Sequence, residues 1–174
     1  MSMTPGQRQL ALTAHVISSV GWLGSIVGFL ALAIGALTSQ NLELVRSSLL
    51  AMNLTAWYVI IPFSFASLIT GLISSLGTKW GLFRHYWVVF KLLINVFANI
   101  VLLMYVPTLA YFADVAANPT LSTNDLQMLR DPSAVLHSSL AVLLLLVATV
   151  LGLYKPRGLT PYGRRQQRKN VPLN

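Results

Sequence analysis

The sequence predicts an all-α integral membrane protein, a bundle of four spanning helices with both termini in the cytoplasm. The first observation is composition, because 55% of the 174 residues are hydrophobic and only 9% are charged, whereas soluble domains carry about 25% charged residues. The second is the presence of apolar runs that match the length of roughly 20 helical residues that a bilayer core requires. The third is the uneven placement of the charges that make up a net charge of +8.

Four apolar runs have the length of a membrane span, and none contains Asp or Glu. They cover residues 11–37, 53–76, 86–106 and 133–154. The third run has an apolar continuation up to residue 112. The first is longer than the apolar core of a cleaved signal peptide, about 7–15 residues, so we interpret it as a retained span. The chain is thus predicted to form one membrane domain, residues 1–154, with a basic tail, residues 155–174.

The charged residues predict the direction of the spans. The basic residues on the side of the termini are Arg8, Lys79, Arg84, Lys155, Arg157, Arg164, Arg165, Arg168 and Lys169. The residues on the other side are Arg46 and Arg130 together with all four acids, Glu43, Asp114, Asp125 and Asp131. Because Lys and Arg gather in cytoplasmic segments, we expect both termini in the cytoplasm. The tail is expected to bind anionic lipids.

The loops and prolines give local predictions. Residues 38–52 are expected to form a short interfacial helix outside the membrane. Ser122 and Asp125 have the spacing of a capping box, and Asp131 followed by Pro132 suits the start of the fourth span. Pro62 is expected to kink the second span.

Small and polar residues predict how the helices associate. Gly24 and Gly28 form a GxxxG pair, which serves either close packing of helices within the chain or a homodimer face. Polar side chains near mid-membrane are expected to bond across helices. They are Asn95 and Asn99 of the third run and Ser64 and Ser67 of the second.

A candidate binding site follows from two histidines near the cytoplasmic ends of the first and third spans. His15 and His85 are expected at similar depth, where two imidazoles on facing helices can ligate haem b or a metal. Lys91 and Arg84 lie on the same side, where they can pair with an anionic group such as a haem propionate. The alternative is that the histidines are ordinary interfacial or hydrogen-bonded residues. In that case Lys91 extends its ammonium group to the interface.

Several classes of function lack the residues that they need. Cysteine is absent, which excludes disulfides, thiolate metal sites and iron–sulfur clusters. The spans hold no carboxylate, which disfavours an autonomous ion-coupled transporter. No hydrolase triad, HExxH motif or phosphate loop is present, so the sequence favours a protein without enzymatic activity. No fold that recognises nucleic acid accompanies the basic tail, so we expect no nucleic-acid partner.

The stretch GTKWGLFRHYWVVFKLLINVFANIVLLMY resembles a group of small uncharacterised bacterial membrane proteins with four spans. In that group a Trp-Gly-Leu turn leads into a helix that starts Arg-His-x-Trp-x-x-x-Lys. The matching residues are Trp80, Gly81, Leu82, Arg84, His85, Trp87 and Lys91. The resemblance implies a multi-pass protein of the bacterial inner (plasma) membrane, and no activity. A more distant similarity is to four-helix membrane cytochromes b and copper-resistance membrane domains, although the histidines of a two-haem cytochrome are missing.

Two functions remain open from the sequence. In the first, the protein has a ligand pocket near the cytoplasmic side, lined by His15, His85 and Lys91, for haem b or another anionic or metal-containing group. In the second, it is a non-catalytic accessory or scaffold subunit that packs against a second copy or a membrane partner protein.

Overall fold

The computed structural model describes residues 3–78, 81–120 and 122–169. Within them, four helices are long and apolar enough to cross a membrane, Pro5–Thr38, Leu42–Leu76, Tyr86–Ala117 and Gln127–Tyr154. The prediction of an all-α protein is therefore confirmed, and four of its helices are able to span a membrane. Lys79 and Trp80, two residues of the predicted cytoplasmic loop, lie outside the described residues.

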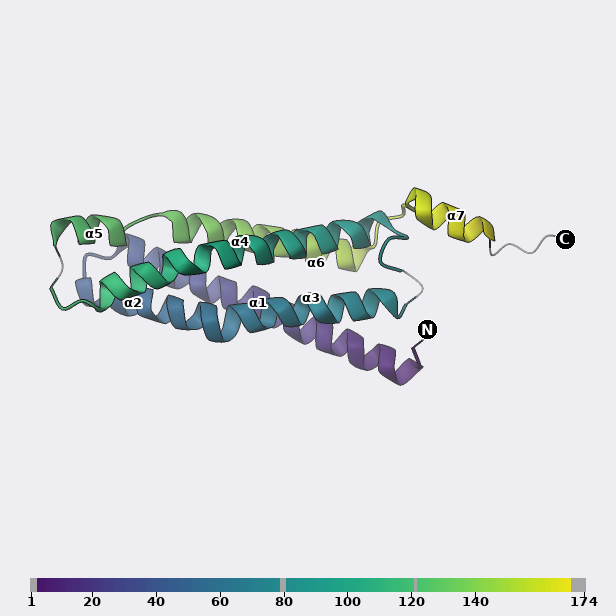
Figure 1. The fold of residues 1–174 in the computed structure, drawn as a ribbon, viewed down its shortest axis with the longest axis horizontal. Helices are drawn as coiled ribbons and strands as arrows, with labels where there is room; N and C mark the ends of the chain where they lie inside the picture. The colour runs from purple at the N-terminus through teal and green to yellow at the C-terminus, as the bar shows by residue number, and fades with distance from the viewer. Residues whose placement is uncertain (1–2, 79–80, 121, 170–174) are drawn as a thin grey trace.

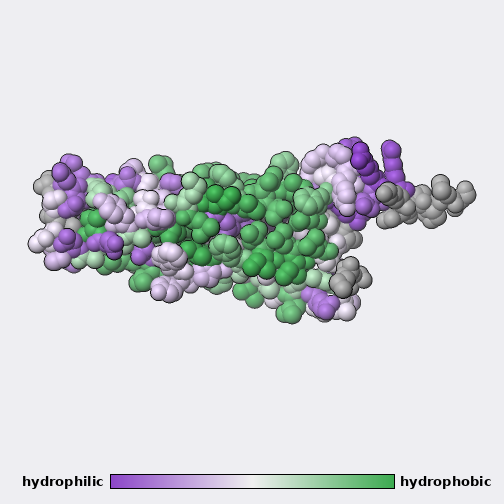
Figure 2. All heavy atoms as spheres, viewed as in Figure 1, coloured by the Kyte–Doolittle hydropathy of each residue, from purple (hydrophilic) through white to green (hydrophobic). Residues whose placement is uncertain are grey.

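The bundle is elongated, and both ends of the chain lie at the same end of it (Figure 1). We call this end the terminal end and the opposite one the loop end. Hydrophobic residues cover the middle of the face drawn in Figure 2, and hydrophilic residues gather toward its two ends. This distribution suits a protein surrounded by lipid, because apolar side chains on the outside of a bundle meet hydrocarbon rather than water.

The first helix, α1 (Pro5–Thr38), starts well before the predicted span at residue 11. A capping box explains the early start. Thr4 Oγ1 accepts a hydrogen bond from the backbone N–H of Gln7, and Gln7 Oε1 accepts one from the N–H of Thr4. Pro5 occupies the first helical position, where its missing N–H costs nothing.

The second span is longer than predicted because the expected interfacial helix is continuous with it. The helix α2 (Leu42–Thr55) passes through a π-helical turn, η1 (Ala56–Ile60), into α3 (Ile61–Leu76). The π turn directly precedes Pro62. Because proline lacks an N–H and its ring collides with the carbonyl four residues earlier, the wider turn accommodates it within a continuous helix.

The third span, α4 (Tyr86–Ala117), also exceeds its prediction and continues through Pro107. Its last turns bury Leu109, Phe112 and Ala113, and this packing favours helix beyond residue 106. The extension shortens the predicted large loop at the loop end to a few residues on either side of the next helix.

Two short capping arrangements organise the loop end. The helix α5 (Thr123–Leu129) begins with the predicted capping box, in which Ser122 Oγ accepts from the N–H of Asp125 and Asp125 Oδ2 accepts from the N–H of Ser122. The helix α6 (Ser133–Tyr154) has the predicted bounds, but its N-cap is Pro132 rather than Asp131. Asp131 Oδ1 accepts from the N–H of Ser133 at 2.7 Å and satisfies one free donor of the new helix.

The four spans surround a common core. The helices α1 and α4 each pack against α6 and against the helix formed by α2, η1 and α3. Trp22, Met52 and Leu109 are the largest side chains that are fully buried. Gly24 and Gly28 face away from this core, and a Cβ added at either position would meet no atom within 4 Å. The expectation that this pair packs helices within the chain is therefore wrong, and the homodimer face stays a prediction.

The tail is more ordered than its composition suggested. After α6, residues 155–160 run along the segment before α4, and α7 (Pro161–Lys169) projects beyond the bundle (Figure 1). The N–H of Tyr86 donates to the carbonyl of Gly158, and the N–H of Thr160 donates to the carbonyl of Arg84. These bonds attach the basic helix to the terminal end of the bundle.

Candidate functional site

His15 lies in the half of the bundle near the terminal end and joins α1 to α3. Its Nδ1 is 3.1 Å from the carbonyl oxygen of Ser67 and 3.2 Å from Thr70 Oγ1. Because a carbonyl oxygen only accepts, Nδ1 carries a hydrogen and donates it to Ser67. Gly71 makes room for the ring, since a Cβ there would lie 3.1 Å from His15 Cε1. The other ring nitrogen, Nε2, is then an acceptor when the imidazole is neutral.

A chain of hydroxyl and amide groups extends from His15 across three helices. Ser19 Oγ lies 2.9 Å from Ser67 Oγ, and Asn95 Nδ2 donates to the same Ser67 Oγ at 3.4 Å. Asn99 Nδ2 donates to Asn95 Oδ1 at 3.0 Å. We call these residues the His15 cluster, and it consists of His15, Ser18, Ser19, Ser67, Thr70, Asn95 and Asn99.

The four polar residues expected near mid-membrane divide into two kinds. Ser67 and Asn95 join α3 to α4 through their side chains. Ser64 instead donates to the carbonyl of Ile61 in its own helix, and Asn99 bonds to Asn95 one turn away. Ser18, Ser19 and Thr70 were not predicted as members of the His15 cluster. Their spacing of three or four residues from His15 or Ser67 places them on the same helix faces and could have indicated them.

Lys91 approaches the same region from α4. Its side chain lies over Gly152 of α6, where an added Cβ would be 2.8 Å from Lys91 Nζ. His15 and Lys155 are both close enough to interact electrostatically with the Lys91 ammonium group. The structure thus brings two potential cations, His15 and Lys91, into one half-buried region.

No Asp or Glu side chain lies near these cations, and all four belong to the described part of the chain. Asp114 is 23 residues beyond Lys91 on the same helix, or about 35 Å at the rise of an α-helix, and the other three acids also belong to the loop end. Within the described residues, the only ion pair joins Arg46 to Glu43 at 3.9 Å, again at the loop end. The charge on Lys91 is therefore not compensated by the described part of the protein.

Arg84 and His85 occupy a different place from His15 and Lys91. His85 is the N-cap of α4 and pairs through its backbone with Leu159 of the C-terminal segment. The carbonyl of Arg84 accepts from Thr160. Six residues, about 9 Å of helix rise, separate His85 from Lys91. Among the described residues, no three His, Asp or Glu side chains lie close enough together to hold a metal ion.

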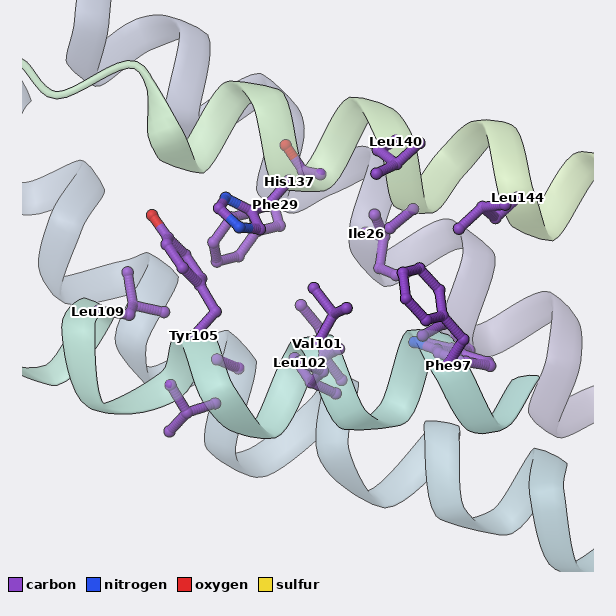
Figure 3. Close-up of a pocket in the computed structure, with 17 residues that line it drawn as sticks. Ile26, Phe29, Phe97, Val101, Leu102, Tyr105, Leu109, His137, Leu140 and Leu144 are labelled. Carbon is purple, nitrogen blue, oxygen red and sulfur yellow. The ribbon is translucent and has the colours of Figure 1, made fainter. Parts of the chain in front are cut away.

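A separate cavity of about 70 Å³ lies farther from the terminal end, between α1, η1, α4 and α6 (Figure 3). Its wall is almost wholly apolar and includes Ile26, Phe29, Phe97, Val101, Leu102 and Leu144. Trp22 also lines it, and the Trp22 indole N–H is buried without a hydrogen-bond partner among the described residues. Ala56 and Ile60, at the two ends of the π turn, form part of the wall.

Tyr105 and His137 stand at the end of the cavity nearer the loop end. Their rings are stacked with centroids 4.4 Å apart, and both are held by Ser133. The Ser133 carbonyl accepts from His137 Nδ1 at 2.7 Å, and Ser133 Oγ lies 3.0 Å from the Tyr105 hydroxyl. The same two rings also line an open hollow of about 540 Å³ on the outside of the bundle, beside Asp131. The stacked pair therefore lies between the cavity and this hollow.

Comparison with known proteins assigns no relative to this chain. No family model matches it, and neither a curated protein nor a solved structure does. The resemblance to small bacterial four-span proteins and to membrane cytochromes b therefore stays a prediction. Any functional conclusion rests on the geometry described above.

Proposed function

We propose that this chain is a multi-pass protein of the bacterial inner membrane, with both termini in the cytoplasm, that binds an anionic group at Lys91 and His15. The orientation is supported by the placement of charge, because basic residues dominate the terminal end and all four acids belong to the loop end. In this orientation the His15 cluster lies in the cytoplasmic leaflet. The binding region is thus at the depth of the inner-leaflet headgroups and of the acyl-chain segments next to them.

One observation carries the proposal: Lys91 is half-buried, and no Asp or Glu among the described residues compensates its charge. A charged side chain within a membrane protein is costly and normally pairs with an opposite charge or reaches water. The charges that act on Lys91 from the described residues, those of Lys155 and of a protonated His15, have the same sign as its own. An anion at this place lowers the energy of each of these groups, whereas a free cation raises it.

The anion is proposed to belong to an amphiphile, because Lys91 lies where α4 borders α6 within the apolar belt. Two sources supply such chemistry. One is the phosphate of an anionic lipid, with the hydroxyl and amide groups of the His15 cluster as further hydrogen-bond partners. The other is a haem b propionate, in which case His15 Nε2, an acceptor in the neutral ring, would be the ligand that the chain offers to the haem iron. His85, at the junction with the C-terminal segment, contributes less directly to either.

The test is to purify the protein from bacterial membranes in mild detergent and identify what remains bound by native mass spectrometry. The visible spectrum is recorded with and without dithionite. We expect a bound anionic amphiphile that is lost from Lys91→Gln and retained by Arg8→Gln, which removes the same charge from the exposed start of α1. A Soret band that disappears in His15→Ala identifies the anion as haem, and a colourless sample with bound phospholipid identifies it as lipid. Equal retention by wild type and Lys91→Gln would refute the proposal.

A further inference from the structure

The cavity between α1, η1, α4 and α6 is distinct from the proposed anion site. Its lining residues include no Lys, Arg, Asp or Glu, and His137 is the titratable side chain other than Tyr105 in its wall. Placing a charge in such a space costs several kcal/mol. A ligand for this cavity is therefore uncharged.

The Trp22 indole N–H indicates which polar group a ligand in the cavity must carry. Trp22 is 1% exposed and its Nε1 has no hydrogen-bond partner among the described residues. The indole N–H can only donate, and a buried donor without an acceptor is unfavourable, above all where no bulk water reaches. The missing partner is an acceptor, such as a carbonyl oxygen, presented from the cavity that Trp22 lines.

The shape of the wall indicates a flat ring. Phe29 and Phe97 face the cavity from α1 and α4, and the stacked rings of Tyr105 and His137 close one end (Figure 3). Aromatic side chains favour offset or edge contacts with another ring. The volume of about 70 Å³ is roughly five times the least that one water molecule requires, and an apolar wall of this kind does not hold water well.

An open hollow adjoins the cavity on the outside of the bundle. The open hollow of about 540 Å³ shares Val101, Tyr105 and His137 with the cavity. The His137 ring is exposed and lies at the boundary between the two spaces. The π turn η1 widens the helix at the opposite wall, and such turns occur frequently at functional sites.

We propose that this cavity binds an uncharged, flat ring with a carbonyl oxygen that accepts a hydrogen bond from Trp22 Nε1. A substituted benzoquinone ring belongs to this chemical class. The ligand reaches the site laterally from the bilayer, past the Tyr105–His137 pair. The anion site and this ring site lie at different depths in the bundle and do not depend on one another.

The test uses the full chain in lipid nanodiscs with ¹⁵N-labelled tryptophan. Duroquinone is titrated in, and the four indole N–H resonances are followed by NMR, with Trp22 assigned from its loss in Trp22→Phe. We expect a saturable downfield shift of the Trp22 proton and little change at Trp57, which lies on the exposed surface. Durene, the same methylated ring without carbonyl groups, should not produce the Trp22 shift.

Two matched variants show where the probe binds. Ala141→Leu places extra volume in the cavity wall and should weaken the titration by roughly tenfold or more, whereas Ala31→Leu on the exposed face of α1 should leave it unchanged. Both proteins are checked for native helicity before titration. The proposal is overturned if the Trp22 resonance does not shift when duroquinone is added, or if durene shifts it equally. It is also overturned if Ala141→Leu leaves the titration unchanged.

Discussion

The ammonium group of Lys91 lies directly over the backbone of Gly152, where a Cβ would stand only 2.8 Å from Nζ. The absence of a side chain at position 152 thus lets Lys91 extend across α6 toward the terminal end. Lys91 was expected to reach the interface along its own stem. The structure adds the partner helix that determines its path.

Gly152→Ala should therefore displace the Lys91 ammonium group while leaving the fold intact. The displaced atom is the flexible end of a long side chain, so the thermal midpoint of unfolding should change little, and the affinity for the bound anion should fall several-fold. Both quantities are measured on the purified protein. Gly28→Ala, where the added Cβ meets open space, is the control. If both variants lose anion binding, the displacement of Lys91 is not the cause of the loss.

Gly163 differs from Gly152 because a Cβ added there meets backbone atoms, which cannot move aside as the end of a lysine side chain can. A Cβ at this position would collide with the carbonyl oxygen of Arg84 and lie 3.1 Å from its carbon. Gly163→Ala should destabilise the attachment of α7 by about 1–3 kcal/mol. The expected result is faster hydrogen exchange at the amides of Tyr86 and Thr160. In Gly6→Ala, which has no atom within 4 Å of the added Cβ, exchange at these amides should stay as in wild type.

Ser67 joins three helices through one side chain, since its hydroxyl lies near Ser19 and accepts from Asn95. Ser67→Ala removes both contacts and leaves the amide of Asn95 without this acceptor. We expect a loss of about 0.6–1.7 kcal/mol in unfolding free energy, measured by unfolding in mixed micelles. Ser139→Ala, at an exposed position of α6, should cost nothing measurable. If both serines cost the same, the His15 cluster does not fix the helix register.

The capping box of α5 gives a pH dependence. Hydrogen bonds from the Ser122 hydroxyl and backbone hold the pKa of the Asp125 carboxyl below its ordinary value of 3.8. A lowered pKa means that the carboxylate stabilises α5 above the ordinary pKa, and this contribution is lost as the pH falls through the lowered value. An NMR titration of Asp125 should show the lowered pKa, and Ser122→Ala should return it toward 3.8. An unchanged pKa in Ser122→Ala would show that the box is not its cause.

Much of the fold could be predicted because membrane spans obey strong local rules. Apolar length located all four spans, and the capping box at Ser122 was identified from two residues. The misplaced boundaries share one cause, which is that helices continue beyond the apolar core when packing or capping supports them. The apolar pattern indicated neither the π turn that accommodates Pro62 nor the continuation of α4 past Pro107, where buried neighbours support the helix.

The candidate sites were predictable only in part. His15 and Lys91 could be singled out because a potential cation in an apolar run is unusual, and the structure brings them into one region. The cavity could not be foreseen, because its wall comes from separate helices and its apolar side chains have the same composition as those that face lipid. Trp22 illustrates the difficulty, since the sequence does not show that its indole N–H has no hydrogen-bond partner among the described residues.

The central claim is that Lys91 binds an anionic group in the cytoplasmic leaflet. The most direct measurement is the affinity of the protein for an anionic phospholipid titrated into nanodiscs of zwitterionic lipid, compared among wild type, Lys91→Gln and Arg8→Gln. The account predicts a loss of roughly tenfold or more in Lys91→Gln, the scale on which removing one partner of a buried charge pair acts, and nearly wild-type affinity in Arg8→Gln. Equal affinities in all three proteins, or equal losses in the two variants, would contradict it.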